Sequence, residues 1–182
     1  MTEVEELKEV DLRSLWPNEE RDFTPWLAEN LDYIADVLGM DLELKQMEKP
    51  VGSYKADLVA QPTQEDIGDV VVENQIGRSD HDHLGKIITY GAGLEASYVV
   101  WICEKIREEH QTAIDWLNDN FPRDLGFLAL EIKVYRIADS EPAPKFEIVS
   151  KPDEWKSYVK STPELTDTKR LQKEFWEGLK EY

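Results

Sequence analysis

Two neighbouring apolar segments of this sequence each place one acidic residue in an apolar setting. Residues 54–60 hold Asp57 among alanine, leucine and valine, and residues 69–75 hold Glu73 directly after three valines. Short runs rich in β-branched residues predict β-strands. An acid inside one strand and an acid at the end of the next can meet at one point, so we expect the two carboxylates within ~4–6 Å of each other.

The rest of the chain predicts helices and strands around this pair. Thr24 and Pro25 form a favoured helix start, a stripe of leucine and isoleucine follows at helical spacing, and Gly39 ends the helix. Short loops between the first three strands indicate an antiparallel meander, and the apolar segment 97–103 indicates a buried central strand. The predicted order is helix 24–38, strands 41–48, 54–60 and 69–75, helix 80–94, strand 97–103, helix 104–118, and strands 127–137 and 145–150. The sequence thus predicts an α/β fold with a mixed central sheet flanked by helices.

Length and composition narrow the class of protein. A chain of 182 residues with 41% hydrophobic residues suits one core-forming domain with an appendage. No segment approaches the ~18–20 consecutive apolar residues of a membrane span, and the acidic N-terminus is unlike a secretory signal. Cys103 is the single cysteine and sits in an apolar run, which excludes a disulfide within the chain and favours a reduced, cytoplasmic protein.

The charge of the chain opposes one function class. The chain has 39 acidic and 21 basic residues, which gives a formal net charge of −18. Nonspecific binding to duplex DNA is driven mainly by neutralisation of phosphates, so this charge opposes it at long range. The acidic excess is concentrated in the first fifty residues and absent from residues 151–182, where a local basic face can persist. We interpret the acidity first as a solvated surface.

The acidic pair can be interpreted as a metal site or as two ordinary surface residues. Mg²⁺ prefers a few carboxylates together with several waters, and Mn²⁺ accepts similar ligands. Asp57 and Glu73 supply two carboxylates, and the backbone carbonyl of Asn74 supplies a third oxygen. Taken singly, an Asp in a strand or a Glu near a strand end is more often a surface residue than a ligand.

A zinc site at residues 80–83 is disfavoured, since its two histidines point to different faces and no cysteine or third histidine completes it. Helix capping by Asp80 is the favoured role there.

The order helix, strand, strand, strand, helix, strand resembles the αβββαβ core of the PD-(D/E)XK, restriction-endonuclease-like superfamily of nucleases. The resemblance implies a metal-dependent site in which Asp57 and Glu73 bind Mg²⁺ and act in catalysis. The superfamily usually keeps a lysine two residues after the glutamate, where this chain has Gln75. Some restriction-like nucleases carry this Glu-x-Gln variant, so the resemblance implies that the Gln75 amide orients a water or a phosphate oxygen.

Further site residues follow from the same resemblance. Some members use an acid on the first helix as an extra metal ligand, a position that Glu29 holds here. Lys86 and Tyr90 are four residues apart and share one face of the predicted helix 80–94. A Gln and a Tyr hold a similar spacing in the recombination-type branch. The resemblance therefore implies a catalytic Lys86 that replaces the missing strand lysine, and substrate contacts from Tyr90 and His83.

The expected function is hydrolysis of DNA phosphodiester bonds, in restriction, repair or phage defence. Paired cuts in duplex DNA usually need two active sites, which is consistent with a homodimer. The alternative is a catalytically degenerate nuclease-fold module that binds nucleic acid or protein. Residues 16–155 also resemble the N-terminal region of a prokaryotic family whose recurrent companion, DUF4268, begins with an aromatic helix like Gln172–Trp176. We therefore expect a nuclease-like domain at 1–160 and a helical extension at 161–182, with Leu171, Phe175 and Leu179 as one stripe.

Overall fold

The computed structural model describes residues 4–64, 67–120 and 124–153. Contacts divide the chain into two compact units, Met1–Pro152 and Asp153–Tyr182. The expected boundary at residue 160 and the predicted C-terminal helix lie outside the described residues. In the part that is described, no helix is long and apolar enough to cross a membrane.

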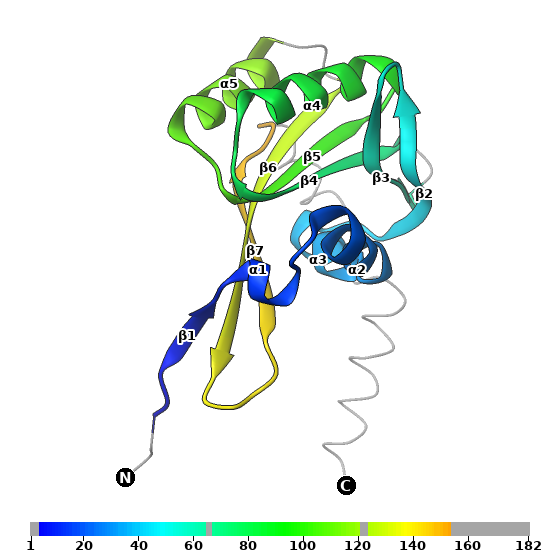
Figure 1. Cartoon of the computed structure of the whole chain (residues 1–182). Helices are drawn as coiled ribbons and strands as arrows, with labels where there is room; N and C mark the ends of the chain where they lie inside the picture. Colours follow the sequence, from blue (N-terminus) through cyan, green and yellow to red (C-terminus); the bar gives the residue numbers. More distant parts are fainter. Residues whose placement is uncertain (1–3, 65–66, 121–123, 154–182) are drawn as a thin grey trace, which may run out of the picture. The chain divides into compact units, whose positions relative to one another are not determined.

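One mixed sheet of seven strands forms the centre of the first unit (Figure 1). The order is β1-β6-β5-β4-β3-β2, and β7 pairs with β6 outside this path. As predicted, β2, β3 and β4 form an antiparallel meander, and β5 runs parallel to both β4 and β6. The strands are β1 (Leu7–Val10), β2 (Leu42–Val51), β3 (Tyr54–Pro62), β4 (Val70–Arg78), β5 (Tyr98–Lys105), β6 (Gly126–Ile137) and β7 (Ala143–Ser150).

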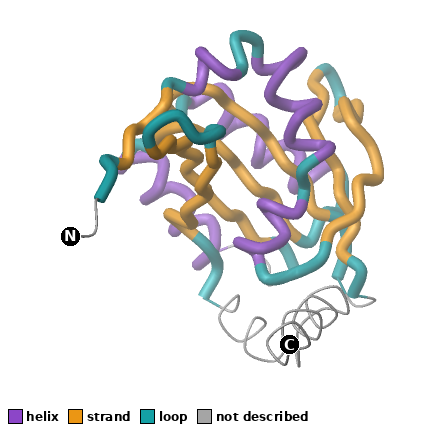
Figure 2. Tube along the Cα trace, turned by 90° about the horizontal axis from the view of Figure 1, so that it is seen from below, coloured by secondary structure: helices purple, strands orange, loops and turns teal. Residues whose placement is uncertain are grey.

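Helices lie on both sides of this sheet (Figures 1 and 2). The core cluster of buried apolar side chains, with Trp101 and Phe127 among the largest, packs between the sheet and the pair α4 and α5. The N-terminal helices lie on the other side, next to β3, β4 and β7. The helices are α1 (Leu12–Leu15), the π-helix η1 (Glu19–Phe23), α2 (Thr24–Glu29), α3 (Asp32–Leu38), α4 (His81–Gly93) and α5 (Glu108–Asn120).

The predicted α/β order is confirmed, with two differences near the N-terminus. The single helix expected over 24–38 is divided into α2 and α3, because the side chain of Asn30 donates to the carbonyl of Trp26 and competes with the helical backbone bonds. β1, α1 and η1 were not predicted. The side chains of β1 are mostly exposed, so its sequence shows no apolar alternation, and only pairing with β6 defines it as a strand.

Candidate functional site: an acidic pair at the end of a strand pairing

The site begins where the pairing of β3 with β4 ends. The last paired residues are Leu58 and Val72, and Asp57 and Glu73 are the next residues on the two strands. Opposite positions of an antiparallel pair point to the same face of a sheet, so the two carboxylates share one face. Asp57 Oδ2 accepts a 2.7 Å hydrogen bond from the backbone N–H of Asn74, which the ladder no longer pairs. The N–H and the carbonyl of one strand residue lie on the same edge, so the Asn74 carbonyl faces β3 as well.

Glu73 is the most buried acid of the site. Its side chain is 2% exposed, and its two oxygens have different surroundings. Oε1 accepts a 3.1 Å hydrogen bond from Nζ of Lys86, on α4. Oε2 is buried and has no hydrogen-bond partner among the residues that the structure describes. A buried carboxylate oxygen without a donor is costly, and a bound cation or an ordered water would satisfy it.

The two acids alter each other's ionisation. Burial, and then the charge of Asp57, raise the pKa of Glu73 to about 8. Burial also raises the pKa of Asp57 to about 6, although the Asn74 hydrogen bond opposes the rise. Burial alone would lower the pKa of Lys86, but Glu73 and then Asp57 outweigh it and raise that pKa. The surroundings therefore favour the protonated form of both carboxyl groups and the charged form of Lys86.

The helical acid at this site is Glu19, not the expected Glu29. Glu29 is exposed in the last turn of α2. Glu19 opens the π-helix η1, and its Oε2 accepts a 2.5 Å hydrogen bond from the backbone N–H of Ile76. Its charge raises the pKa of both Asp57 and Glu73. The sequence signal for it is Asn18, which caps η1 just ahead of this acid and accepts from the N–H of Arg21.

The amide of Gln75 has its nitrogen and its oxygen in different surroundings. Its amide nitrogen donates to the carbonyl of Arg78 at 2.8 Å and to Asp80 Oδ2 at 2.6 Å. Both N–H bonds of the amide are therefore used in the turn between β4 and α4, whereas its Oε1 is buried without a hydrogen-bond partner among the described residues. The residue holds Asp80 in position at the start of α4.

Asp80 fixes the ring of His83. As expected from the sequence, Asp80 caps α4, and its Oδ1 accepts from the backbone N–H of His83 at 2.9 Å and lies 2.8 Å from His83 Nδ1. Burial would raise the pKa of Asp80, but these bonds with His83 outweigh it and lower that pKa. The other ring nitrogen, Nε2, lies 3.9 Å from Glu73 Oε1. The imidazole is thus oriented towards the acidic pair.

Tyr90, expected to contact substrate, is a fully buried packing residue. Its side chain has no exposed surface, and its hydroxyl donates a 2.7 Å hydrogen bond to the carbonyl of Lys55. This bond ties α4 to β3 close to Asp57. Tyr90 therefore acts on the site by holding the helix that carries Lys86 against the strand that carries the acid.

In the three described stretches, no group of three or more His, Cys, Asp or Glu side chains is arranged to hold a metal ion. The histidine of the disfavoured zinc site, His81, turns towards α5, where its Nδ1 lies 2.7 Å from Nε2 of His110. Two facing carboxylates, one with an unpartnered buried oxygen, fit Mg²⁺, which keeps several of its waters.

Two solved structures are similar to part of the chain. A repair endonuclease from Pyrococcus abyssi matches with a TM-score of 0.46 and 18% identity over 63% of this chain and 47% of that one. SfsA from Pyrococcus furiosus, in complex with Ca²⁺, matches with a TM-score of 0.37 and 13% identity over 69% of this chain and 59% of that one. The chain therefore spans less than two thirds of either structure. No protein-family model and no curated protein matches the sequence.

Proposed function

We propose that this protein is a metal-dependent nuclease that hydrolyses phosphodiester bonds, with DNA as its substrate. The observation that carries the proposal is the acidic pair beyond the last paired residues of β3 and β4, where Asp57 faces Glu73 and Lys86 donates to Glu73. This combination of a buried acid, a half-buried acid and one lysine suits phosphate chemistry better than a structural role, because it is costly to bury and leaves Glu73 Oε2 without a donor from the described residues.

Each residue has a defined task in the proposed reaction. Asp57 and Glu73, with the Asn74 carbonyl, would hold Mg²⁺ or Mn²⁺, which when bound supplies an activated water and neutralises charge on the phosphate. Lys86 carries a positive charge at the same point and stabilises negative charge that develops on the phosphate. Asp80 accepts from His83 Nδ1–H and keeps Nε2 directed at the pair, where the neutral ring can accept a hydrogen bond from a water.

Cleavage of labelled single-stranded and double-stranded DNA tests the proposal directly. The wild type should cut in Mg²⁺ or Mn²⁺ and not in EDTA. Asp57→Asn and Lys86→Ala should each lower the rate ~10²-fold or more, as is typical for loss of a positioned charged group. Lys45→Ala is the matched control, because that lysine is exposed and paired with Asp69. A wild type that cuts no substrate in either metal, or an Asp57→Asn variant that cuts at the normal rate, contradicts the proposal.

One observation favours the alternative of a degenerate nuclease-fold module. The Lys86 ammonium already neutralises Glu73 at 3.1 Å, so the described residues balance part of the site's charge without a metal ion. Titration with Mg²⁺, followed by thermal unfolding, separates the two cases. A nuclease should gain stability as the metal occupies its site, whereas a degenerate module should respond to Mg²⁺ no more than its Asp57→Asn variant does.

A further inference from the structure

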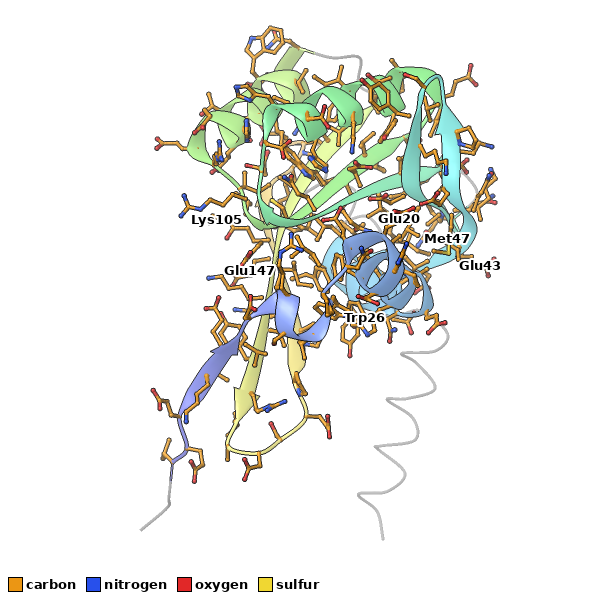
Figure 3. All side chains as sticks on the ribbon, in the orientation of Figure 1. Glu20, Trp26, Glu43, Met47, Lys105 and Glu147 are labelled. Carbon is orange, nitrogen blue, oxygen red and sulfur yellow. The ribbon has the colours of Figure 1, made fainter. Side chains whose placement is uncertain are left out.

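Basic side chains gather at the C-terminal ends of the parallel strands β4 and β5. Arg78 is the last residue of β4 and pairs in register with Lys105, the last residue of β5. Arg107 follows in the next loop, and Arg13 of α1 donates to the carbonyl of Ile76 at 3.1 Å. Figure 3 shows the Lys105 side chain extending away from the ribbon at this edge. Four cations thus lie around one end of the strand that carries Glu73.

The local backbone brings these residues together. The register of β4 against β5 shifts between Gln75 and Arg78, and Gly77 within this bulge has a φ of +126°, which residues with a side chain rarely adopt. Beyond the bulge, the N–H of Ser79 donates to the carbonyl of Lys105 at 2.9 Å, and its Oγ accepts from the N–H of Arg107 at 2.8 Å. The segments that follow β4 and β5 are therefore joined by hydrogen bonds, which place Arg78 and Arg107 on adjoining stretches of backbone.

Arg78 and Arg107 differ from the lysines that the described acids already neutralise. Lys45, Lys55 and Lys145 each pair with an exposed or half-exposed carboxylate. Arg78 and Arg107 are exposed, and neither forms a salt bridge with an acid of the described residues.

The other two cations, Arg13 and Lys105, also place positive charge at this edge. Arg13 donates only to the backbone carbonyls of Ile76 and Pro17, which do not neutralise it. Lys105 pairs with Glu131 at 3.0 Å but keeps 59% of its side chain exposed. The first turn of α5 carries two glutamates directly after Arg107 in the chain, which place negative charge near this edge as well.

We propose that Arg78 and Arg107, assisted by Arg13, bind backbone phosphates of the nucleic-acid strand that enters the acidic site. This inference rests on the proposed nuclease function and names its substrate-binding residues. The planar guanidinium group matches two phosphate oxygens at once and remains charged at every relevant pH. At about 3.3 Å per strand residue, Arg78 lies at most ~17 Å from Glu73 along β4. That distance is within the span of a few nucleotides, so one strand can contact both places.

Binding measurements with exposed variants test this inference. Fluorescence anisotropy of a labelled single strand, as DNA and as RNA of the same sequence, is followed against NaCl concentration with Ca²⁺ and again with EDTA. Arg78→Gln and Arg107→Gln should each weaken binding several-fold and reduce the slope of log K against log salt by ~0.7 for one lost phosphate contact on a single strand. Lys45→Gln and Lys145→Gln are the matched controls, because they remove exposed lysines that are already paired.

The outcomes separate this inference from the proposed function. If the wild type binds and cuts DNA while the arginine variants keep the binding constant and salt slope of the controls, the arginine site is wrong and the nuclease stands. If the wild type neither binds nor cuts either strand, both are wrong. Equal weakening on DNA and RNA supports recognition of the shared phosphodiester backbone. Thermal unfolding at the wild-type midpoint shows that each variant is folded.

Discussion

Among single residues, Glu73 has the most unusual surroundings. Its carboxyl group is almost fully buried, with a lysine at one oxygen and no hydrogen-bond donor from the described residues at the other. Burying this carboxyl group without a full set of hydrogen bonds lowers the stability of the fold. Such costs are typical of functional sites. Asp57, which accepts from the backbone N–H of Asn74, adds a second carboxyl group on the neighbouring strand.

Glu73→Gln should change how stability depends on pH. The pKa of Glu73 is raised in the folded state from its ordinary value of 4.5 to about 8, so folding favours the protonated acid. The contribution of protonated Glu73 to the free energy of unfolding is fully present below pH ~4.5 and is lost as the pH rises through ~8. In EDTA, the free energy of unfolding of the wild type should therefore fall between these values relative to that of the variant.

Urea denaturation at a series of pH values measures this difference. Glu48→Gln makes the same chemical change at a half-exposed residue of β2 that pairs with Lys55, and it should run parallel to the wild type. Parallel curves for Glu73→Gln and the wild type would show that burial of this acid has no energetic consequence. Addition of Mg²⁺ should restore the stability of the wild type at high pH, because the cation replaces the proton.

At the scale of elements, the bulge at the end of β4 and the start of α4 position most of the site. Gln75 donates to Asp80, Asp80 caps α4, and α4 presents Lys86 to Glu73. Tyr90 anchors the same helix to β3. The helix and the two strands therefore form one unit, in which a change at the bulge is transmitted to the acidic pair.

Two glycine substitutions should have opposite effects on stability. A Cβ atom at Gly77 or at Gly85 would meet no atom within 4 Å, so neither change is opposed by packing. Gly77 has a φ of +126°, and Ala there should cost ~1–3 kcal/mol of backbone strain. Gly85 lies inside α4, where Ala should stabilise by ~0.8–1 kcal/mol because it has the higher helix propensity. Chemical denaturation measures the change in the free energy of unfolding for each variant. If both variants are stabilised, the bulge does not need a glycine.

At the scale of the whole molecule, the main feature is the large excess of negative charge. A net charge of −18 produces repulsion within the folded state. Arg78, at the end of β4, and Arg107, in the loop after β5, are the places where we propose that the protein binds the phosphates of a polyanion. Binding of that kind should be weak away from this edge and sensitive to salt.

Salt should stabilise the protein by screening this repulsion. Raising NaCl from ~0.01 M to ~0.15 M shortens the Debye length from ~30 Å to ~8 Å, so the thermal midpoint in EDTA should rise over this interval. Differential scanning fluorimetry measures the midpoint. Sucrose provides the control, since it acts by exclusion from the surface and should stabilise equally at low and high salt. A midpoint that is unchanged or falls with NaCl would show that ion pairs outweigh the net repulsion.

The sequence by itself determined the order of the core elements and the two strands that carry Asp57 and Glu73. Those predictions follow from hydrophobic period and turn residues, which are local properties of the chain. Only the tertiary structure decided which helical acid joins the pair, because Glu19 reaches it through a π-helix with no simple period. It also decided the bonding of Gln75 and the burial of Tyr90, since a hydrogen-bond partner depends on which segments the fold brings together.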